Sequence, residues 1–201
     1  MVAERRRGDA DTATRILDVA ERLAQTRGFN GFSYADIAIE LGITKAALHY
    51  HFASKADLGQ ALIGRYAARF GEALAAIEAG TTAAPAKLRG YAGLYADVLR
   101  NERMCLCGML AAEYPTLPGA MQASVVSFFD QNETWLQHVL EQGRSDDSLH
   151  FTGSPLDTAR MIISCLEGAM LVTRPYGDSP RFQDAAASLI TGLTTPAAVQ
   201  G

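Results

Sequence analysis

The segment from residue 32 to residue 58 constrains the fold more than any other, because it is typical of two short helices joined by a tight turn. Ile37, Ala38 and Leu41 are spaced so that they form one apolar face of a first helix. Gly42 follows directly, and glycine is the residue type that most often ends a helix. The pattern therefore predicts a helix that stops at residue 41 and a chain that then turns sharply.

A second short helix is predicted immediately after this turn. Thr44 is a suitable N-cap for it, as Ser33 is for the first helix. Ala47, Leu48 and Phe52 form its inward side. A turn of this length sets two helices at a steep angle, which is the helix-turn-helix arrangement that places its second helix in the major groove of DNA.

The outward side chains of the second helix suit contact with DNA. Small residues at Ala46 and Ala47 allow the helix to approach base edges closely, and Lys45 is long enough to reach a guanine or a phosphate. Further donors at the height of the phosphates are Tyr50, His51 and Lys55. The alternative is a plain two-helix corner, which also needs a glycine turn and apolar spacing.

The residues that follow the turn favour DNA binding over the plain corner. The motif comprises Gly28-Phe29, Ser33-Tyr34, Ile37-Ala38, Leu41 to Lys45, Leu48 to Phe52, Ser54-Lys55 and Leu58. It resembles the DNA-binding domain of the TetR/AcrR family of transcriptional regulators over about the first third of the chain. The Tyr-His-Phe-x-Ser-Lys run is the most specific part, because it is much rarer than the general helix-turn-helix pattern.

The resemblance implies an all-α homodimer with about nine helices in each chain. Residues 1–55 are expected to form a three-helix DNA-binding domain, and residues 56–201 a helical domain for ligand binding and dimerisation. The positions that the resemblance assigns to DNA are Ser33, Tyr34, Thr44, Lys45, Ala46, Ala47, His49, Tyr50, His51 and Lys55. Among them, Thr44, Tyr50, His51 and Lys55 fall where phosphates are held. Position 49 is more often Tyr in this family, so His49 is a departure, and the operator sequence of a relative does not transfer to this chain.

The remaining sequence shows helical periodicity and no competing strand pattern. Predicted helices cover 11–27, 56–78, 86–101, 105–114, 118–143, 155–174 and 180–193. Loops rich in proline and glycine separate them. Residues 11–27 are expected to brace the DNA-binding domain, and residues 56–78 to connect it to the second domain.

Composition and charge agree with a cytoplasmic regulator. The chain has 201 residues, 48% hydrophobic and 20% charged, with no apolar stretch long enough to span a membrane and no apolar segment typical of a secretory signal. Its three cysteines do not indicate a disulfide framework. Residues 1–60 carry 8 basic and 8 acidic side chains, so the net charge of -4 belongs to the rest of the chain.

A neutral DNA-binding domain must place its few cations well. Arg5, Arg6 and Arg7 lie in residues 1–8, which are predicted to form a flexible arm that reaches DNA. A solvated tail without a partner is the alternative for this run.

The last two long helices are predicted to form the dimer surface. Residues 156–174 are apolar on more than one face, which indicates burial on both sides. Two such helices from each protomer build a four-helix interface with two-fold symmetry. The predicted interface residues are Met161, Cys165, Gly168, Ala169, Phe182, Ala186, Leu189, Ile190 and Leu193. The alternative is that both helices belong to the core of one chain.

A small-molecule effector of unknown identity is expected to bind between the helices of the second domain. Its candidate contacts are Tyr95, Cys105, Cys107, Met109, Leu110, Tyr114, Phe128, Phe129 and Trp135. A stripe of aromatic residues and Met is also typical of an ordinary core, and that alternative stays open.

Cys105 and Cys107 permit three interpretations. A metal site lacks further ligands nearby, and we expect none. A redox or electrophile sensor fits a cysteine at a helix start beside Arg103, which favours the thiolate. TetR-like regulators that respond to quinones or reactive carbonyls have a Cys in a comparable region, and the 178–182 stretch is also similar to theirs. Simple packing is the third interpretation, and Cys165 is expected to be structural.

The sequence therefore predicts a repressor that a small apolar or electrophilic effector releases from a palindromic operator. Effector binding, or modification of Cys105 or Cys107, would tilt the 56–78 helix and change the spacing of the two recognition helices. No cofactor and no catalysis are expected. An enzyme using Cys105 or His138, His150, Glu113, Glu133 and Glu141 would lack any recognisable catalytic motif. A helical adaptor that binds only proteins would leave the Tyr-His-Phe-x-Ser-Lys run without a purpose.

Overall fold

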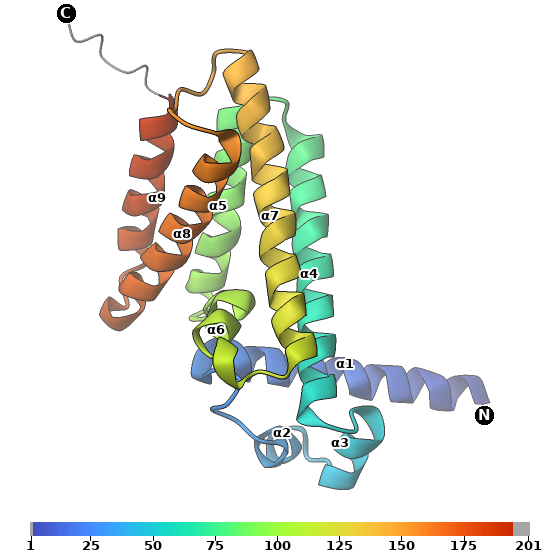
Figure 1. The fold of residues 1–201 in the computed structure, drawn as a ribbon. Helices are drawn as coiled ribbons and strands as arrows, with labels where there is room; N and C mark the ends of the chain where they lie inside the picture. Colours follow the sequence, from blue (N-terminus) through green and yellow to red (C-terminus); the bar gives the residue numbers. More distant parts are fainter. Residues whose placement is uncertain (1, 195–201) are drawn as a thin grey trace, which may run out of the picture. The chain divides into compact units, whose positions relative to one another are not determined.

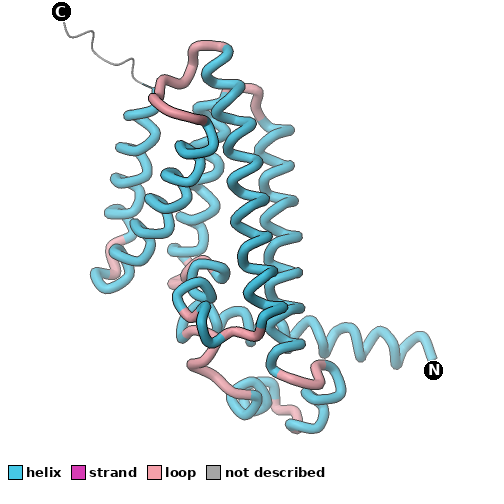
Figure 2. Tube along the Cα trace, in the orientation of Figure 1, coloured by secondary structure: helices cyan, strands magenta, loops and turns pink. Residues whose placement is uncertain are grey.

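The structure is a computed structural model that describes residues 2–194, and for residues 2–8 it describes the backbone alone. Within residues 2–194 the chain forms nine α-helices and two short 3-10 helices, with no strand (Figures 1 and 2). The predicted all-α fold is thereby confirmed.

The first five helices are α1 (Val2–Arg27), α2 (Tyr34–Leu41), α3 (Lys45–His51), α4 (Lys55–Gly80) and α5 (Ala84–Arg100). They are followed by α6 (Leu106–Ala112), η1 (Tyr114–Thr116), α7 (Gly119–Ser145), α8 (Pro155–Thr173), η2 (Arg174–Tyr176) and α9 (Ser179–Thr194).

Helix α1 is longer than predicted, because it begins at Val2 rather than at Asp11. The side chains of residues 1–8 lie outside the described part of the chain, so the predicted DNA contact of Arg5, Arg6 and Arg7 remains a prediction.

The chain divides into two compact units, and the division does not follow the order of the sequence. One unit contains the residues up to Ala68 together with Cys105–Val126. The other contains Arg69–Met104 together with the residues from Ser127 onward. Helices α4 and α7 each contribute to both units. The domain boundary predicted at residue 55 therefore stays a prediction about which residues bind DNA and which bind the effector.

The core of the first unit joins the helix-turn-helix pair to α1 and α4. Ile16 of α1, Ile37 of α2, Leu48 of α3 and Leu58 of α4 are each 0% exposed. Since every one of these helices is short or amphipathic, burial of these apolar side chains supplies most of the stability that holds them together.

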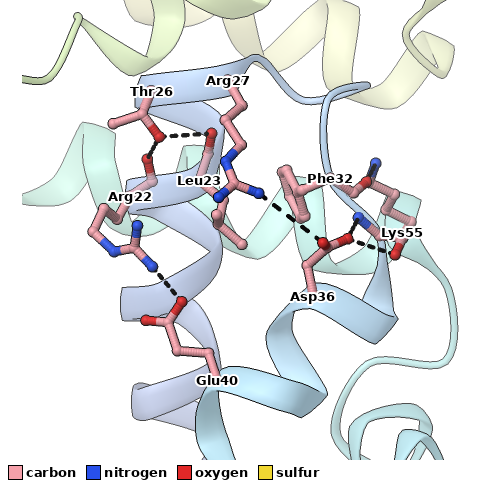
Figure 3. Close-up of polar contacts among 9 residues, drawn as sticks. Arg22, Leu23, Thr26, Arg27, Phe32, Asp36, Glu40 and Lys55 are labelled. Carbon is pink, nitrogen blue, oxygen red and sulfur yellow. Dashed lines mark hydrogen bonds and ion pairs between the residues drawn. The ribbon is translucent and has the colours of Figure 1, made fainter.

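Ion pairs at the surface connect α1 to α2 beside this core. Arg22 reaches Glu40, and one guanidinium nitrogen of Arg27 lies 4.0 Å from the Asp36 carboxylate (Figure 3). These side chains are exposed, so they orient the two helices and contribute little to stability.

The segment after α5 enters the first unit through contacts with the loop that follows α1. The Asn30 amide N–H donates to the Glu113 carboxylate over 3.1 Å, and the Asn30 side chain donates to the Thr116 hydroxyl over 2.8 Å. In α7, the Ser124 hydroxyl donates to the Gln60 side chain of α4 over 3.0 Å. These polar contacts explain why Cys105–Val126 belongs to the first unit.

The second unit is a helical layer in which α9 packs against both α5 and α8 (Figure 1). Its interior contains a group of polar side chains. The Tyr91 hydroxyl lies 3.1 Å from the Tyr95 hydroxyl and donates to the side-chain amide oxygen of Asn132 over 3.1 Å. Lys87 is 3% exposed and donates to Glu78 and Gln142. Across the described residues, no helix combines the length and apolar character that a membrane crossing requires.

Candidate nucleic-acid interface

The turn between α2 and α3 is fixed by two local features. Gly42 has φ 65 and ψ 31, the left-handed conformation that glycine adopts without strain. The Ile43 N–H then donates to the Ala38 carbonyl over 3.1 Å, which closes the end of α2. At the other end of α2, the Asp36 carboxylate accepts from the Ser33 N–H over 2.8 Å and from the Ser33 hydroxyl over 2.6 Å. These bonds hold the Asp36 pKa below its usual value and occupy the Ser33 side chain.

Helix α3 begins at a conventional cap and is held down by one buried residue. The Thr44 hydroxyl oxygen accepts from the Ala47 N–H over 3.1 Å, so the hydroxyl proton remains available to a phosphate. Leu48 is completely buried and fixes the rotation of this short helix.

The face of α3 opposite Leu48 is exposed. Lys45, Ala46, His49 and Tyr50 lie on the surface, and Ala47 and His51 are half-buried. The Tyr50 side chain is 75% exposed, which is unusual for an aromatic ring, and its centroid lies 5.2 Å from the centroid of His51. The small side chains at the start of α3 suit apolar contact with a thymine methyl group, and Lys45 suits contact with a guanine edge.

Tyr34 faces the interior of the helix-turn-helix rather than the exposed face of α3. Its hydroxyl lies 2.9 Å from the Phe52 carbonyl and 2.7 Å from the Ser54 carbonyl, and its ring centroid is 4.8 Å from that of His49. Burial, with the nearby Asp57 charge, raises the pKa of Tyr34 to about 12. Tyr34 therefore supports the turn between α3 and α4.

The Lys55 side chain has partners within the chain that the sequence did not predict. Its ammonium donates to the carbonyls of Phe29 and Phe32 and lies 4.7 Å and 4.4 Å from the centroids of their rings. Burial lowers the pKa of Lys55, and the charges of Glu113 and Asp36 partly oppose this effect. A cation held in this way ties α4 to the loop before α2, and its contact with a phosphate stays a prediction.

Cys105 lies against α4 within the first unit. It is 1% exposed and caps α6, where its sulfur accepts from the Gly108 N–H over 3.4 Å. The Tyr66 hydroxyl of α4 donates to the same sulfur over 3.6 Å. Cys107 is fully buried. Among the side chains that the structure describes, residues 9–194, no three or more His, Cys, Asp or Glu gather in a way that would hold a metal ion.

The predicted effector residues are divided between the two units. Tyr95, Phe128, Phe129 and Trp135 lie in the second unit, whereas Cys105, Cys107, Met109, Leu110 and Tyr114 lie in the first. The aromatic residues of the second unit pack on one another. The Tyr91 and Trp135 rings stack with centroids 5.7 Å apart, and the Phe70 and Phe128 centroids are 5.2 Å apart. Phe70 was not identified from the sequence, because ordinary core residues have the same spacing.

Most of the predicted dimer residues on α9 face the core of their own chain. Phe182, Ala186, Ile190 and Leu193 are at most 9% exposed, and Leu189 is half-buried. A side chain buried by α5 and α8 has little surface left for a partner, and the place of these residues in the interface stays a prediction.

Helix α8, by contrast, has an open apolar face. Met161 is 43% exposed, Leu171 62% and Val172 58%, while Gly168 and Ala169 are half-buried. The last two exposed residues were missed because α8 is apolar nearly all round. Cys165 is also exposed on this helix, so it is not the buried structural residue that the sequence indicated.

Two family models match the chain. Residues 16–62 match the model for bacterial regulatory proteins of the tetR family, and residues 84–189 match the tetracyclin repressor-like C-terminal domain.

Solved structures and curated proteins agree with these models. A TetR-family regulator from Agrobacterium tumefaciens is 32% identical, with a TM-score of 0.90 over 93% of this chain and 100% of that one. A TetR regulator from Legionella pneumophila is 34% identical, with a TM-score of 0.81 over 89% and 95% of the two chains. The Escherichia coli repressor NemR is 25% identical over 93% of this chain and 96% of its own length. The structure of reduced NemR has a TM-score of 0.79 over 92% of this chain and 99% of that chain.

Proposed function

Because this chain belongs to the TetR family of bacterial regulatory proteins, we propose that it is a homodimeric repressor that an effector releases from a palindromic operator. The observation that carries the proposal is the exposed face of α3, where Tyr50 is 75% exposed beside Lys45 and Ala46. Every relative described above is a transcriptional regulator, which favours this function over an enzyme or an adaptor. Binding to an operator agrees with a cytoplasmic location, because that is where the DNA of a bacterium lies.

His49 gives the recognition helix a property of its own. Its Nδ1 lies 3.0 Å from the Ala53 carbonyl, and since a carbonyl only accepts, Nδ1 carries the proton. In the neutral ring, Nε2 is then an acceptor. We therefore expect His49 to accept from a base amino group, such as that of adenine or cytosine.

The experiment that tests the proposal is recovery of genomic DNA bound by the purified protein, followed by affinity measurement on the recovered sites. Tyr50→Ala combined with Lys45→Ala should abolish recovery of a palindromic site, because both side chains are exposed on α3. Arg89→Ala removes an exposed cation of α5 and should leave recovery unchanged. Equal recovery by the α3 double variant and by the Arg89 variant would overturn the proposal.

For the effector we propose a soft electrophile that alkylates Cys105. The Tyr66 hydroxyl and the Gly108 N–H both donate to its sulfur, and these hydrogen bonds oppose the effect of burial, which disfavours a thiolate. The solved structure of NemR is described as that of its reduced form, which supports the same idea here. A non-covalent apolar effector in the second unit is the alternative.

Cys105 also has a direct route to the DNA-binding helices. Its hydrogen-bond partner Tyr66 lies on α4, directly after Arg65. Arg65 forms ion pairs with two residues of α1, Asp18 at 2.7 Å and Glu21 at 2.8 Å. A group added to the sulfur displaces the Tyr66 hydroxyl and thereby moves α4 against α1. A coupling of about 1–3 kcal/mol is sufficient for regulation.

Iodoacetamide tests this route. The sulfur displaces iodide, a C–S bond forms, and the thiol proton goes to solvent. Cys165→Ser removes the exposed cysteine that would react first, and in this background alkylation of Cys105, followed by mass spectrometry, should release the operator. Release that persists in Cys105→Ser/Cys165→Ser would contradict the assignment and leave the non-covalent effector.

A further inference from the structure

A hollow of about 390 Å³ lies in the second unit, lined by residues at the ends of α5 and α8 and at the start of α9. Two segments that are far apart in the sequence form it. Its walls are Leu99, Arg100, Glu102, Arg103, Met104, Thr173, Arg174, Gly177, Asp178 and Ser179. None of the residues predicted to contact an effector belongs to this set, so the hollow is a separate feature of the fold.

Arg103 differs from the neighbouring arginine Arg100 in its ion pairing. Arg100 is paired with Asp97, and Asp178 lies 3.9 Å from Arg181. Arg103 is half-buried and forms no ion pair with any described residue. Because a guanidinium does not lose its proton in proteins, Arg103 retains its positive charge at the wall of the hollow.

The residue before Arg103 has a strained backbone conformation. Glu102 has φ 57, the left-handed conformation that usually holds Gly or Asn at the end of a helix. Its N–H donates to the Leu99 carbonyl over 2.9 Å, and the Arg103 N–H donates to the Val98 carbonyl over 3.1 Å. Strained residues of this kind gather at functional sites, and Glu102 itself lines the hollow.

We propose that this hollow binds a small organic carboxylate. Arg103 and Arg174 would hold the carboxylate, since the fork of a guanidinium matches its two oxygens. Leu99 and Met104 provide an apolar wall for the rest of the molecule. The volume of the hollow is at the lower end of the range for ligand pockets, so it suits a small ligand with about one ring. Glu102 opposes the bound anion and keeps its affinity moderate.

The test uses benzoate and its neutral isostere benzamide, titrated into the full-length ¹⁵N-labelled protein without DNA. Benzoate should cause saturable shifts of the Gly177 and Ser179 amide signals, and benzamide should cause none. Absence of saturable shifts at tens of millimolar benzoate, or equal shifts with benzamide, would overturn the proposal. The result does not depend on operator binding, so the site and the repressor function are tested separately.

Two variants with opposite expected effects sharpen the test. Arg103→Met should weaken benzoate binding about tenfold, because a charge-assisted bidentate contact is lost. Glu102→Gln removes a repelling charge and should strengthen binding several-fold. Arg89→Met, a change to an exposed arginine elsewhere on α5, should have no effect. Unchanged affinity in both the Arg103 and Glu102 variants contradicts the proposal, and the Glu102 variant remains informative if Arg103→Met does not fold.

Discussion

At the scale of single residues, two side chains of the helix-turn-helix motif hold the first unit together through bonds to backbone carbonyls. Tyr34 and Lys55 belong to the DNA-binding motif, yet the Tyr34 hydroxyl and the Lys55 ammonium each donate to backbone carbonyls inside the first unit. The partners of Lys55 are Phe29 and Phe32, more than twenty residues earlier in the chain. Periodicity describes one helix at a time, so it contains no information on such a contact.

Lys55→Met therefore tests whether this lysine serves the fold. The substitution keeps an apolar stem over the two rings but leaves the Phe29 and Phe32 carbonyls without their donor. Unfolding in urea should show a loss of about 1–3 kcal/mol. Lys45→Met, a change to an exposed lysine, should stay within about 0.5 kcal/mol of the wild type. If the Lys55→Met variant has normal stability but binds the operator more weakly, the lysine serves a phosphate contact and not the fold.

At the scale of helices, prediction succeeded where turn residues end an element locally. The sequence placed a helix at residues 155–174, and α8 runs from Pro155 to Thr173 because the Ser154 hydroxyl accepts from the Asp157 N–H over 3.0 Å. The start of α1 was missed because no capping residue or proline marks it. The faces of α8 and α9 were also hard to assign, since a helix that is apolar all round does not reveal which side meets its own core.

Gly42 and Gly64 provide a matched pair at this scale, because a Cβ atom meets open space at both positions. Gly42→Ala forces an alanine into the left-handed conformation and should cost about 1 kcal/mol. Gly64→Ala lies inside α4 and should instead stabilise the protein by about 0.5–1 kcal/mol. Urea unfolding of the two variants measures both effects, and a change of the same sign in both would contradict this account of the turn.

At the scale of the whole molecule, chain order is a poor guide to which segments form a unit. The boundary expected after residue 55 separates Cys105 from the helix-turn-helix, whereas Cys105–Val126 and the residues up to Ala68 form one compact unit. The contacts that join them, from Tyr66 to Cys105 and from Asn30 to Glu113, link residues 39 and 83 positions apart. A motif confined to residues 28–58 gives no sign of such contacts. A sensor built on Cys105 thus belongs to the unit that reads DNA.

The same scale decides how two chains meet. In the described chain, α9 has already buried Phe182 and Leu193, so the exposed apolar residues of α8 are the surface that a partner must cover. In a two-fold interface each residue is present twice near its symmetry mate, so one added charge repels its own copy. Leu171→Glu combined with Val172→Glu should therefore convert the dimer into a monomer of 21.5 kDa in sedimentation analysis.

The matched control for the dimer prediction is Val126→Glu, because Val126 is an apolar residue that is 45% exposed on α7. This variant should sediment as the wild-type dimer does, and it should retain operator binding. The α8 variant should lose operator binding together with dimerisation, since two recognition helices about 34–36 Å apart are needed to read successive half-sites. Dissociation by Val126→Glu, with an intact dimer in the α8 variant, would move the interface from α8 to α7.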